Sequence, residues 1–194
     1  TDVALFEREV ETVLVPDCVP DWLTSHLNFP GCEVITDHDP VRAMKAIKNE
    51  TEQDGIRACH KRDGKAVTRV IEEIQSTKGL TEKDIEEMLL QERQKDRAFR
   101  GVSFDTIAGW NENGAKIHGQ PSTTEIKGNG LLLIDSGGQY DDGTTDVTRT
   151  IGIGKPTKAM KEKFTIVLKA HIALATAIFP EGTTGIQLDA IARK

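Results

Sequence analysis

The sequence has few cysteines, and they form none of the patterns that disulfide-stapled or zinc-binding proteins show. Only three occur in 194 residues: Cys18, Cys32 and Cys59. Their number is odd, and their spacing matches neither a disulfide framework nor a zinc finger. Without such a framework, a reducing compartment is the default expectation. We therefore predict a cytoplasmic protein.

Long apolar runs and blocks of positive charge are also missing. A membrane-spanning helix needs about 20 consecutive apolar residues. The most apolar stretch, residues 166–179, is shorter and contains Lys169 and His171. The formal net charge is −6, and no segment is rich in Lys and Arg. These absences argue against a membrane protein and against a nucleic-acid partner.

What remains is the composition of an ordinary globular protein, with 37% hydrophobic and 29% charged residues. The length suits one large domain, or one domain and part of another. Turn residues at 37–40 predict a boundary that separates residues 1–38 from a larger domain at 39–194. Because the chain begins at Thr1 and ends within a predicted helix, we expect it to be a piece of a longer polypeptide.

The larger domain reads as helices, then strands, then a helix, which is typical of an α+β fold with helices packed on a curved antiparallel sheet. Asn49 or Thr51 is expected to cap a long helix ending near residue 77, and Thr81 with Asp84 resembles the capping arrangement of a second helix. The run "LLLID" at 131–135 is apolar up to its final Asp135, which predicts a strand buried on both faces. The other predicted elements are strands at 102–110, 115–119 and 145–154 and a helix at 156–179.

The segment "LLLIDSGGQYDDGTTDVTRTIGIG", residues 131–154, places four carboxylates on what otherwise reads as a buried hairpin. They are Asp135, Asp141, Asp142 and Asp146. An unpaired buried carboxylate costs on the order of several kcal/mol, and neighbouring like charges add to that cost. A divalent cation would remove both costs. The alternative is a surface hairpin whose carboxylates are solvated.

The spacing of Asp135 and Asp146 supports a shared metal site. They are eleven residues apart, which puts both side chains on one face of a hairpin with an even-numbered loop. Asp141 and Asp142 we assign to the turn, where Asp is common. A tight turn at Asp142 and Gly143 would pair Asp135 with Thr150, too far from Asp146, so we expect a wider turn or a bulge to shift the register. Two oxygen ligands suit Mg²⁺, Mn²⁺ or Zn²⁺.

The run "IDSGGQYDDGTTDVTRT" at 134–150 resembles the metal-binding hairpin of the Xaa-Pro aminopeptidases (aminopeptidase P). These enzymes belong to the pita-bread metallopeptidases, with methionine aminopeptidase, prolidase and creatinase. Three other segments also resemble that family: "MKAIKNETE" at 44–52, "FRGVSFDTIAGWNENGAKIHGQP" at 99–121 and "FPEGTTGIQLDAIAR" at 179–193. The resemblance covers about residues 40–194. It implies that 39–194 form the first half of a pita-bread domain and that 1–38 are the tail of a preceding domain.

The resemblance also implies functional residues. Asp135 and Asp146 match two family metal ligands, for two divalent ions that are most often Mn²⁺, with Zn²⁺ or Co²⁺ as alternatives. His118 matches an active-site histidine that holds the substrate or its tetrahedral intermediate, although Gly119 replaces the usual aromatic residue after it. On its own, a single His beside a turn would be read as a surface residue. The implied reaction removes the N-terminal residue from peptides with Pro second, by two-metal activation of water.

The family's remaining His and Glu ligands lie downstream of the hairpin, and this sequence has no His or Glu after Glu181. We therefore expect the chain alone to be inactive. The implied partners are the peptide substrate, the remainder of the chain's own catalytic domain and a second copy in a homodimer. Two alternatives remain: a prolidase-type dipeptidase, which differs in the hairpin, and a non-catalytic pita-bread module that binds peptides. Retention of Asp135 and Asp146 favours an enzyme.

Overall fold

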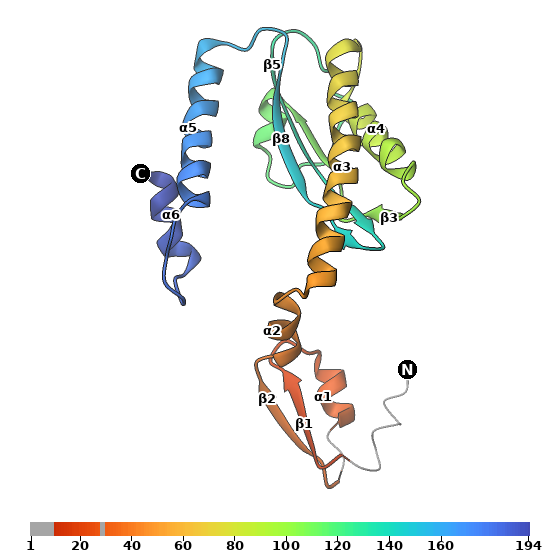
Figure 1. The fold of residues 1–194 in the computed structure, drawn as a ribbon, viewed down its shortest axis with the longest axis vertical. Coiled ribbons are helices and arrows are strands. Elements are labelled where there is room, and N and C mark those ends of the chain that lie inside the picture. The colour runs from red at the N-terminus through yellow and green to blue at the C-terminus, as the bar shows by residue number, and fades with distance from the viewer. Residues whose placement is uncertain (1–9, 28–29) are drawn as a thin grey trace. The chain divides into compact units, whose positions relative to one another are not determined.

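The computed structural model describes residues 10–27 and 30–194 and divides the chain into two compact units, residues 1–53 and 54–194 (Figure 1). The division between the units falls within helix α3 (Glu50–Ser76). The domain boundary expected from the sequence, between residues 38 and 39, stays a prediction.

The first unit contains a small parallel β-α-β arrangement. Strands β1 and β2 pair in parallel, with Thr12 opposite Glu33, and helix α1 connects them. Val15 and Leu27 are buried in this unit. Helix α2 begins where the side chain of Asp39 accepts a hydrogen bond from the backbone of Val41, at 2.9 Å. The elements are β1 (Thr12–Pro16), α1 (Asp21–Leu27), β2 (Glu33–Asp37) and α2 (Pro40–Ala46).

Two capped helices form one layer of the second unit. At the start of α3, Asn49 and Glu52 each accept a hydrogen bond from the other's backbone, both at 2.9 Å. Helix α4 (Glu82–Gln94) begins with a capping box between Thr81 and Asp84. Both caps confirm the starts predicted from the sequence. Because these side chains satisfy backbone donors that lack a partner within the helix, they fix where each helix begins.

Helices α3 and α4 cover one face of the sheet that contains β5 (Gly130–Ser136) (Figure 1). Leu132 and Ile134 of β5 are at most 1% exposed and form the core with Val70 of α3 and Leu89 of α4. Alternate residues of β5 are only half-buried on the other face, so the expectation of burial on both faces is wrong. The sheet orders are β4-β5-β8 and β3-β6-β7, with β6 (Gly138–Tyr140), β7 (Gly143–Thr144) and β8 (Val147–Ile153).

The strand predicted at 102–110 is two strands, β3 (Phe99–Val102) and β4 (Ile107–Trp110). They separate because β3 pairs with β6 in one sheet, whereas β4 pairs with β5 in the other. The strand predicted at 115–119 is also wrong. That segment is a turn that follows the short 3-10 helix η2 (Asn111–Ala115).

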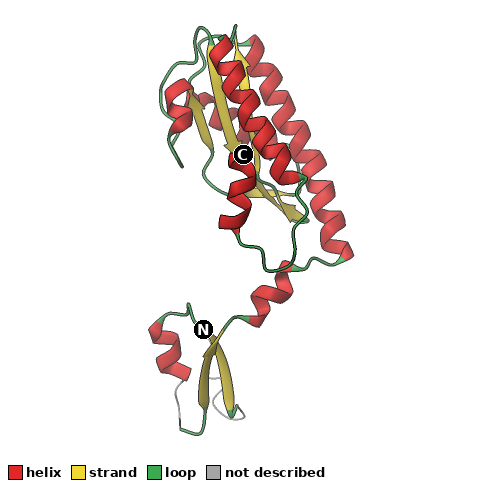
Figure 2. Ribbon diagram, turned by 90° about the vertical axis from the view of Figure 1, so that its left-hand side faces the viewer, coloured by secondary structure: helices red, strands yellow, loops and turns green. Residues whose placement is uncertain are grey.

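Helix α5 (Lys158–Ala175) stands on the opposite side of the sheet from α3 and α4 (Figures 1 and 2). It has no buried residue, and its apolar side chains include Phe164, Ile166 and Val167, all exposed. The helix ends earlier than the predicted residue 179, and α6 (Gly185–Arg193) follows it. In the part of the chain that the structure describes, no helix combines the length and the hydrophobicity that a bilayer crossing requires.

Candidate metal centre

The hairpin with the candidate ligands turns at Asp141 and Asp142, since Tyr140 pairs with Gly143 across it. The sequence predicted this turn one residue later. Gly143 serves close packing instead: a Cβ at that position would lie 2.7 Å from Sγ of Cys59 on α3. The two carboxylates assigned to the turn are therefore at the turn, and the strands begin directly beside them.

This turn sets the register of the candidate ligands. Asp135 pairs with Thr148, and the next pair is Ser136 with Val147. Asp146 immediately precedes β8, two residues before Thr148. Continuing the alternation of β8 back by one residue would put it on the same face as Asp135, as a diagonal neighbour. Diagonal neighbours have Cβ atoms about 7 Å apart. The predicted wider turn is absent between β6 and β7, because a two-residue turn placed one position earlier pairs Asp135 with Thr148 instead of Thr150.

Asp135 has a buried oxygen without a protein partner. Its Oδ1 atom is inaccessible to solvent and accepts no hydrogen bond within residues 10–27 and 30–194. Because a buried carboxylate oxygen without a partner is costly, it suits a position where a cation supplies the interaction. Asp146 is exposed just before β8. Two carboxylates are the hard oxygen donors that Mg²⁺ and Mn²⁺ accept, so these residues fit a divalent cation.

The described residues offer a pair of candidate ligands rather than a full set. Among them, no group of three or more His, Cys, Asp or Glu side chains is placed to hold a metal ion. Structural and catalytic metal sites usually take three or four protein ligands. Asp135 and Asp146 would therefore form only part of a centre.

Gly137 allows the two ligand-bearing strands to approach closely. A Cβ on Gly137 would lie 2.0 Å from the carbonyl oxygen of Thr145 and 2.3 Å from Oγ of Ser103. Ser103 bridges the same segments: its backbone N donates to the Gly137 carbonyl at 3.1 Å, and its hydroxyl donates to the Thr145 carbonyl at 2.8 Å. Any side chain at Gly137 would push apart the chain segments that carry Asp135 and Asp146.

Asp141 and Asp142 are engaged in ion pairs at the turn. Arg100 donates from Nε to Asp141 at 2.7 Å, and Arg62 donates from Nη2 to Asp142 at 2.6 Å. The hydrogen bond from Arg62 lowers the pKa of Asp142. These contacts tie the turn to neighbouring segments and distinguish both residues from Asp135, whose Oδ1 has no such partner in the described part of the chain.

His118 lies in an exposed turn after η2, with a φ of 52°. The helix η2 packs over the ligand-bearing face of the sheet, because a Cβ on Gly114 would lie 3.4 Å from Cβ of Leu133. Leu133 is two residues before Asp135 in β5, so both side chains lie on that face of the sheet. The turn with His118 thus starts from the same side of the sheet as Asp135. Its role stays a prediction.

Glu82 anchors both ends of the loop that presents His118, a role that no local sequence pattern indicates. The side chain is 0% exposed. Its Oε1 accepts from the Trp110 backbone at 2.7 Å and from Nδ2 of Asn113 at 2.8 Å, while Oε2 accepts from the Ser122 backbone at 3.0 Å and hydroxyl at 2.6 Å. Burial raises the pKa of Glu82, but these hydrogen bonds outweigh burial and the net shift is downward.

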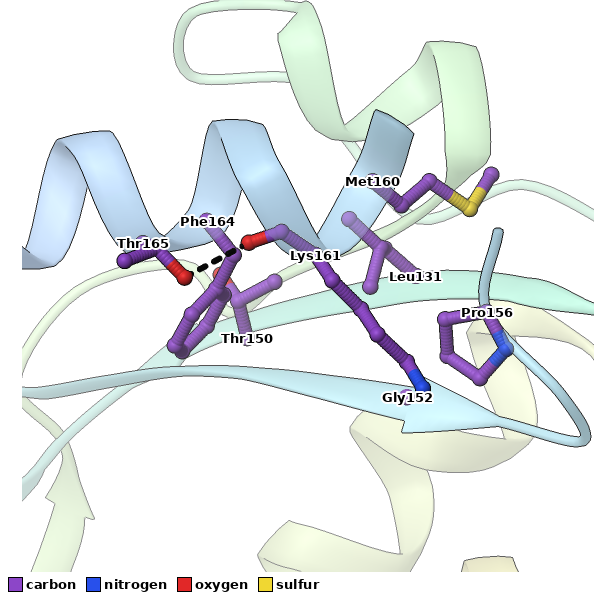
Figure 3. A pocket seen from close by; sticks show the side chains of 8 residues that line it. All are labelled: Leu131, Thr150, Gly152, Pro156, Met160, Lys161, Phe164 and Thr165. Atoms are coloured by element: carbon purple, nitrogen blue, oxygen red, sulfur yellow. Dashed lines mark hydrogen bonds between the residues drawn. The ribbon is translucent and has the colours of Figure 1, made fainter. Parts of the chain in front are cut away.

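A separate apolar pocket of about 300 Å³ lies between the strands and α5 (Figure 3). Leu131 and Gly152 line it from the sheet, and Met160 and Phe164 line it from the helix. Leu131 is four residues from Asp135 along β5, a distance of about 13 Å in an extended strand. The lining extends along β8 to Thr150 but includes neither candidate ligand, so the pocket is distinct from the candidate metal centre.

Comparisons with known proteins identify relatives of the chain. The model of metallopeptidase family M24 matches residues 54–194. A probable Xaa-Pro aminopeptidase P of Aspergillus fumigatus is 48% identical over 182 residues, which are 89% of this chain and 28% of the relative. A protein of the same name from Sordaria macrospora is 46% identical over 163 residues, 80% of this chain and 26% of the relative. The chain thus spans about a quarter of the length of these curated relatives.

Solved structures give the same result. An X-prolyl aminopeptidase of Caenorhabditis elegans, described as a cytosolic enzyme with a di-nuclear active site, matches with a TM-score of 0.83 and 33% identity over 94% of this chain and 31% of that one. A prolidase of Pyrococcus furiosus matches with a TM-score of 0.80 and 29% identity over 94% of this chain and 53% of that one. The resemblance to Xaa-Pro aminopeptidases and the α+β fold of a partial pita-bread domain are confirmed. The chain belongs to metallopeptidase family M24.

Proposed function

We propose that the protein containing this chain is an Xaa-Pro aminopeptidase. It removes the N-terminal residue from peptides with Pro at the second position, using two divalent metal ions. The similar proteins of Aspergillus and Sordaria bear that name at 48% and 46% identity. The structural observation that carries the proposal is the buried Oδ1 of Asp135, which has no partner among the described residues and shares a strand face with Asp146.

Asp135 and Asp146 hold the metal ions in this proposal. When bound, divalent ions supply Lewis-acid activation of a water molecule and of the scissile carbonyl. The C. elegans relative is described as having a di-nuclear active site, which supports two ions here. Mn²⁺ is our first choice, with Zn²⁺ and Co²⁺ as alternatives, because two carboxylates alone do not select among them.

His118 serves the substrate. A histidine N–H in the active site donates a hydrogen bond to the oxygen on which negative charge develops, or it positions the peptide for attack. The two anchors of its loop, at Asn113 and Ser122, leave the intervening turn exposed, where a peptide can reach His118. Glu82 would then act on the reaction indirectly, by fixing the loop.

The rest of the site is proposed to come from the remainder of the same catalytic domain. The chain covers only 28% of the A. fumigatus relative, and no three-ligand group exists among the described residues. We infer that the chain alone does not hydrolyse peptides and that the intact protein is a cytoplasmic homodimer. The description of the C. elegans relative as cytosolic supports the location. Light scattering of the intact protein tests the dimer: a monomer mass contradicts it.

A prolidase-type dipeptidase is the second candidate, because the P. furiosus prolidase shares the fold at a TM-score of 0.80. The two activities differ in substrate length. An aminopeptidase P cleaves Arg-Pro-Pro, whereas a prolidase requires a dipeptide such as Ala-Pro. Preferential cleavage of the dipeptide would move the protein to the prolidase class, and cleavage of neither would favour a non-catalytic peptide-binding module.

The test compares cleavage of Arg-Pro-Pro by the intact protein, by the 194-residue chain and by an intact Asp135→Asn, Asp146→Asn double variant. We expect the double variant to lose at least about 10³-fold in kcat/KM, since metal ions supply several kcal/mol of transition-state stabilisation. Asp141→Asn is the matched control, because it removes a hairpin carboxylate assigned to the turn. Activity that survives in the double variant contradicts the ligand assignment, and activity of the short chain contradicts the shared-domain proposal.

A further inference from the structure

A buried ion pair lies on the other face of the sheet from the candidate ligands. Asp63 of α3 and Arg93 of α4 both have side chains that are 0% exposed. Arg93 donates to Asp63 from Nε at 2.6 Å and from Nη2 at 3.3 Å. Burial raises the pKa of Asp63, but the hydrogen bonds and charge of Arg93 outweigh it, so the pKa lies below its usual range. The pair is therefore ionised at neutral pH.

The pair reaches the hairpin directly beside both candidate ligands. Arg93 donates from Nη2 to the hydroxyl of Ser136 at 3.1 Å, and Ser136 is the residue after Asp135. The hydroxyl of Tyr140 donates to Asp63 at 2.7 Å. Hydrogen bonding from the side chain of Thr145, the residue before Asp146, also contributes to the lowered pKa of Asp63. One ion pair thus contacts a neighbour of each ligand.

Because side chains alternate along a strand, contacts that fix Ser136 on one face also affect the direction of Asp135 on the other face. Ser136 projects into the core, so Asp135, one residue earlier, must project to the other side. A fixed Ser136 hydroxyl therefore fixes the rotation of β5 and the direction of the Asp135 carboxylate. Thr145 is likewise 0% exposed beside the exposed Asp146. Its hydroxyl accepts a hydrogen bond from the Gly138 backbone at 2.9 Å, which connects it to the facing strand.

Net stability alone does not account for such a pair. Replacing a buried ion pair with apolar side chains of similar volume is often neutral or stabilising, whereas breaking it by removing one partner is strongly destabilising. The best-attested use of buried polar groups is to specify one arrangement among several. Here the pair would specify the distance between the chain segments at Gly137 and Thr145, where the two sheets divide.

We propose that Asp63 and Arg93 are positioning residues that set the spacing and direction of the Asp135 and Asp146 carboxylates before any metal binds. This inference rests on the proposed metal-binding role of those two carboxylates. In this proposal, α3 and α4 do more than form the core. Through contacts with Ser136, Tyr140 and Thr145, they fix the position of the two candidate ligands from the opposite face of the sheet.

The test uses the intact protein and two variants that each remove one hydroxyl of the network, Ser136→Ala and Tyr140→Phe. Val70→Ala is the matched control, because Val70 is buried in α3 but belongs to the apolar core. Its substitution lowers Tm by leaving a cavity, without touching the network. Amide hydrogen exchange in the metal-free protein is the first measurement, and Mn²⁺ affinity by equilibrium dialysis is the second. Ser136→Thr, which keeps the hydroxyl, tests rescue.

We expect exchange at residues 135–146 to accelerate at least about tenfold in the network variants, and Mn²⁺ affinity to fall about tenfold, the lower end of the effect seen for groups that orient metal ligands. Val70→Ala should change neither the exchange rate nor the Mn²⁺ affinity, even where its loss of Tm equals that of a network variant. Ser136→Thr should restore both quantities. Network variants that behave like Val70→Ala overturn the inference while leaving the proposed function standing. Unchanged Mn²⁺ binding in Asp135→Asn, Asp146→Asn would instead overturn the proposed function itself.

Discussion

The hairpin with Asp135 and Asp146 and the loop with His118 border the same strand pair, but different interactions hold them. In the hairpin, β5 pairs with β8 as far as Ser136 and Val147, and β6 pairs with β7 in the same register up to the turn. The loop after β4 has little such pairing, and the buried carboxylate of Glu82 anchors its two ends. A strand pair carries its own register along its length, whereas a loop needs a partner from elsewhere in the fold. Changes confined to one region or the other should therefore have separate effects.

The largest effect is expected from Gly137→Val, which strikes the hairpin. The new Cβ would meet the Thr145 carbonyl oxygen at 2.0 Å, and backbone atoms cannot move aside as a flexible side chain can. We expect a loss of about 3 kcal/mol in the free energy of unfolding, the upper range for overpacking. Urea denaturation measures it. Gly64→Ala in α3 is the control, since nothing lies within 4 Å of that Cβ, and it should stabilise by about 0.5–1 kcal/mol. Equal effects would contradict the close approach at Gly137.

The loop should respond to Glu82→Ala. This change leaves buried donors at Trp110 and Ser122 without their acceptor, which costs about 2–3 kcal/mol. Amide exchange should accelerate at residues 111–122 before it accelerates in the hairpin. Glu87→Ala, on the exposed side of α4, should stay within about 0.5 kcal/mol of wild type. If amide exchange accelerated equally in the loop and in the hairpin, the two regions would not be held by separate interactions.

The buried carboxylate of Glu82 should also make the free energy of unfolding depend on pH. Because the folded state lowers the pKa of Glu82, its stabilisation is fully present above the unfolded pKa of about 4.3. It is lost as pH falls through the lower folded pKa, where the folded state also binds the proton. The stability difference between wild type and Glu82→Gln should therefore shrink from pH 7 to pH 3. Urea titrations at stepped pH measure it, and a constant difference contradicts the assignment.

The smallest effect is expected at the tip of the hairpin. Arg100 and Asp141 form an ion pair with side chains 56% and 54% exposed, and exposed pairs contribute about 0.2–1 kcal/mol. Asp141→Asn should therefore change stability by less than about 1 kcal/mol and leave Mn²⁺ affinity unchanged. A double-mutant cycle with Arg100→Gln measures the coupling. A large loss of Mn²⁺ affinity would mean that Asp141 is a ligand after all.

The sequence predicted the parts of the fold that depend on local chemistry. The caps at Asn49 and Thr81 and the apolar run of β5 are local signals, and each is present in the structure. The shared face of Asp135 and Asp146 followed from their odd spacing, although the turn lay one residue earlier than predicted. Gly143 instead lies close to Cys59 of α3, and packing between distant segments leaves no local pattern.

The misses share one physical cause, which is contact between residues far apart in the chain. Glu82 reads as an ordinary acidic residue in the first turn of a helix, and only the fold brings it to Ser122, 40 residues away. The ion pair of Asp63 and Arg93 joins positions that look like surface charges on amphipathic helices. The segment around His118 alternates like a strand, but it forms a turn after η2.

We propose above all that the carboxylates of Asp135 and Asp146 bind the same divalent cations. The most direct measurement is a crystal structure of the intact protein soaked in Mn²⁺, with anomalous difference maps at the manganese edge. We predict an anomalous peak within coordination distance of carboxylate oxygens from both residues, including Oδ1 of Asp135. A peak that contacts neither residue, with their carboxylates directed apart into solvent, would contradict the account.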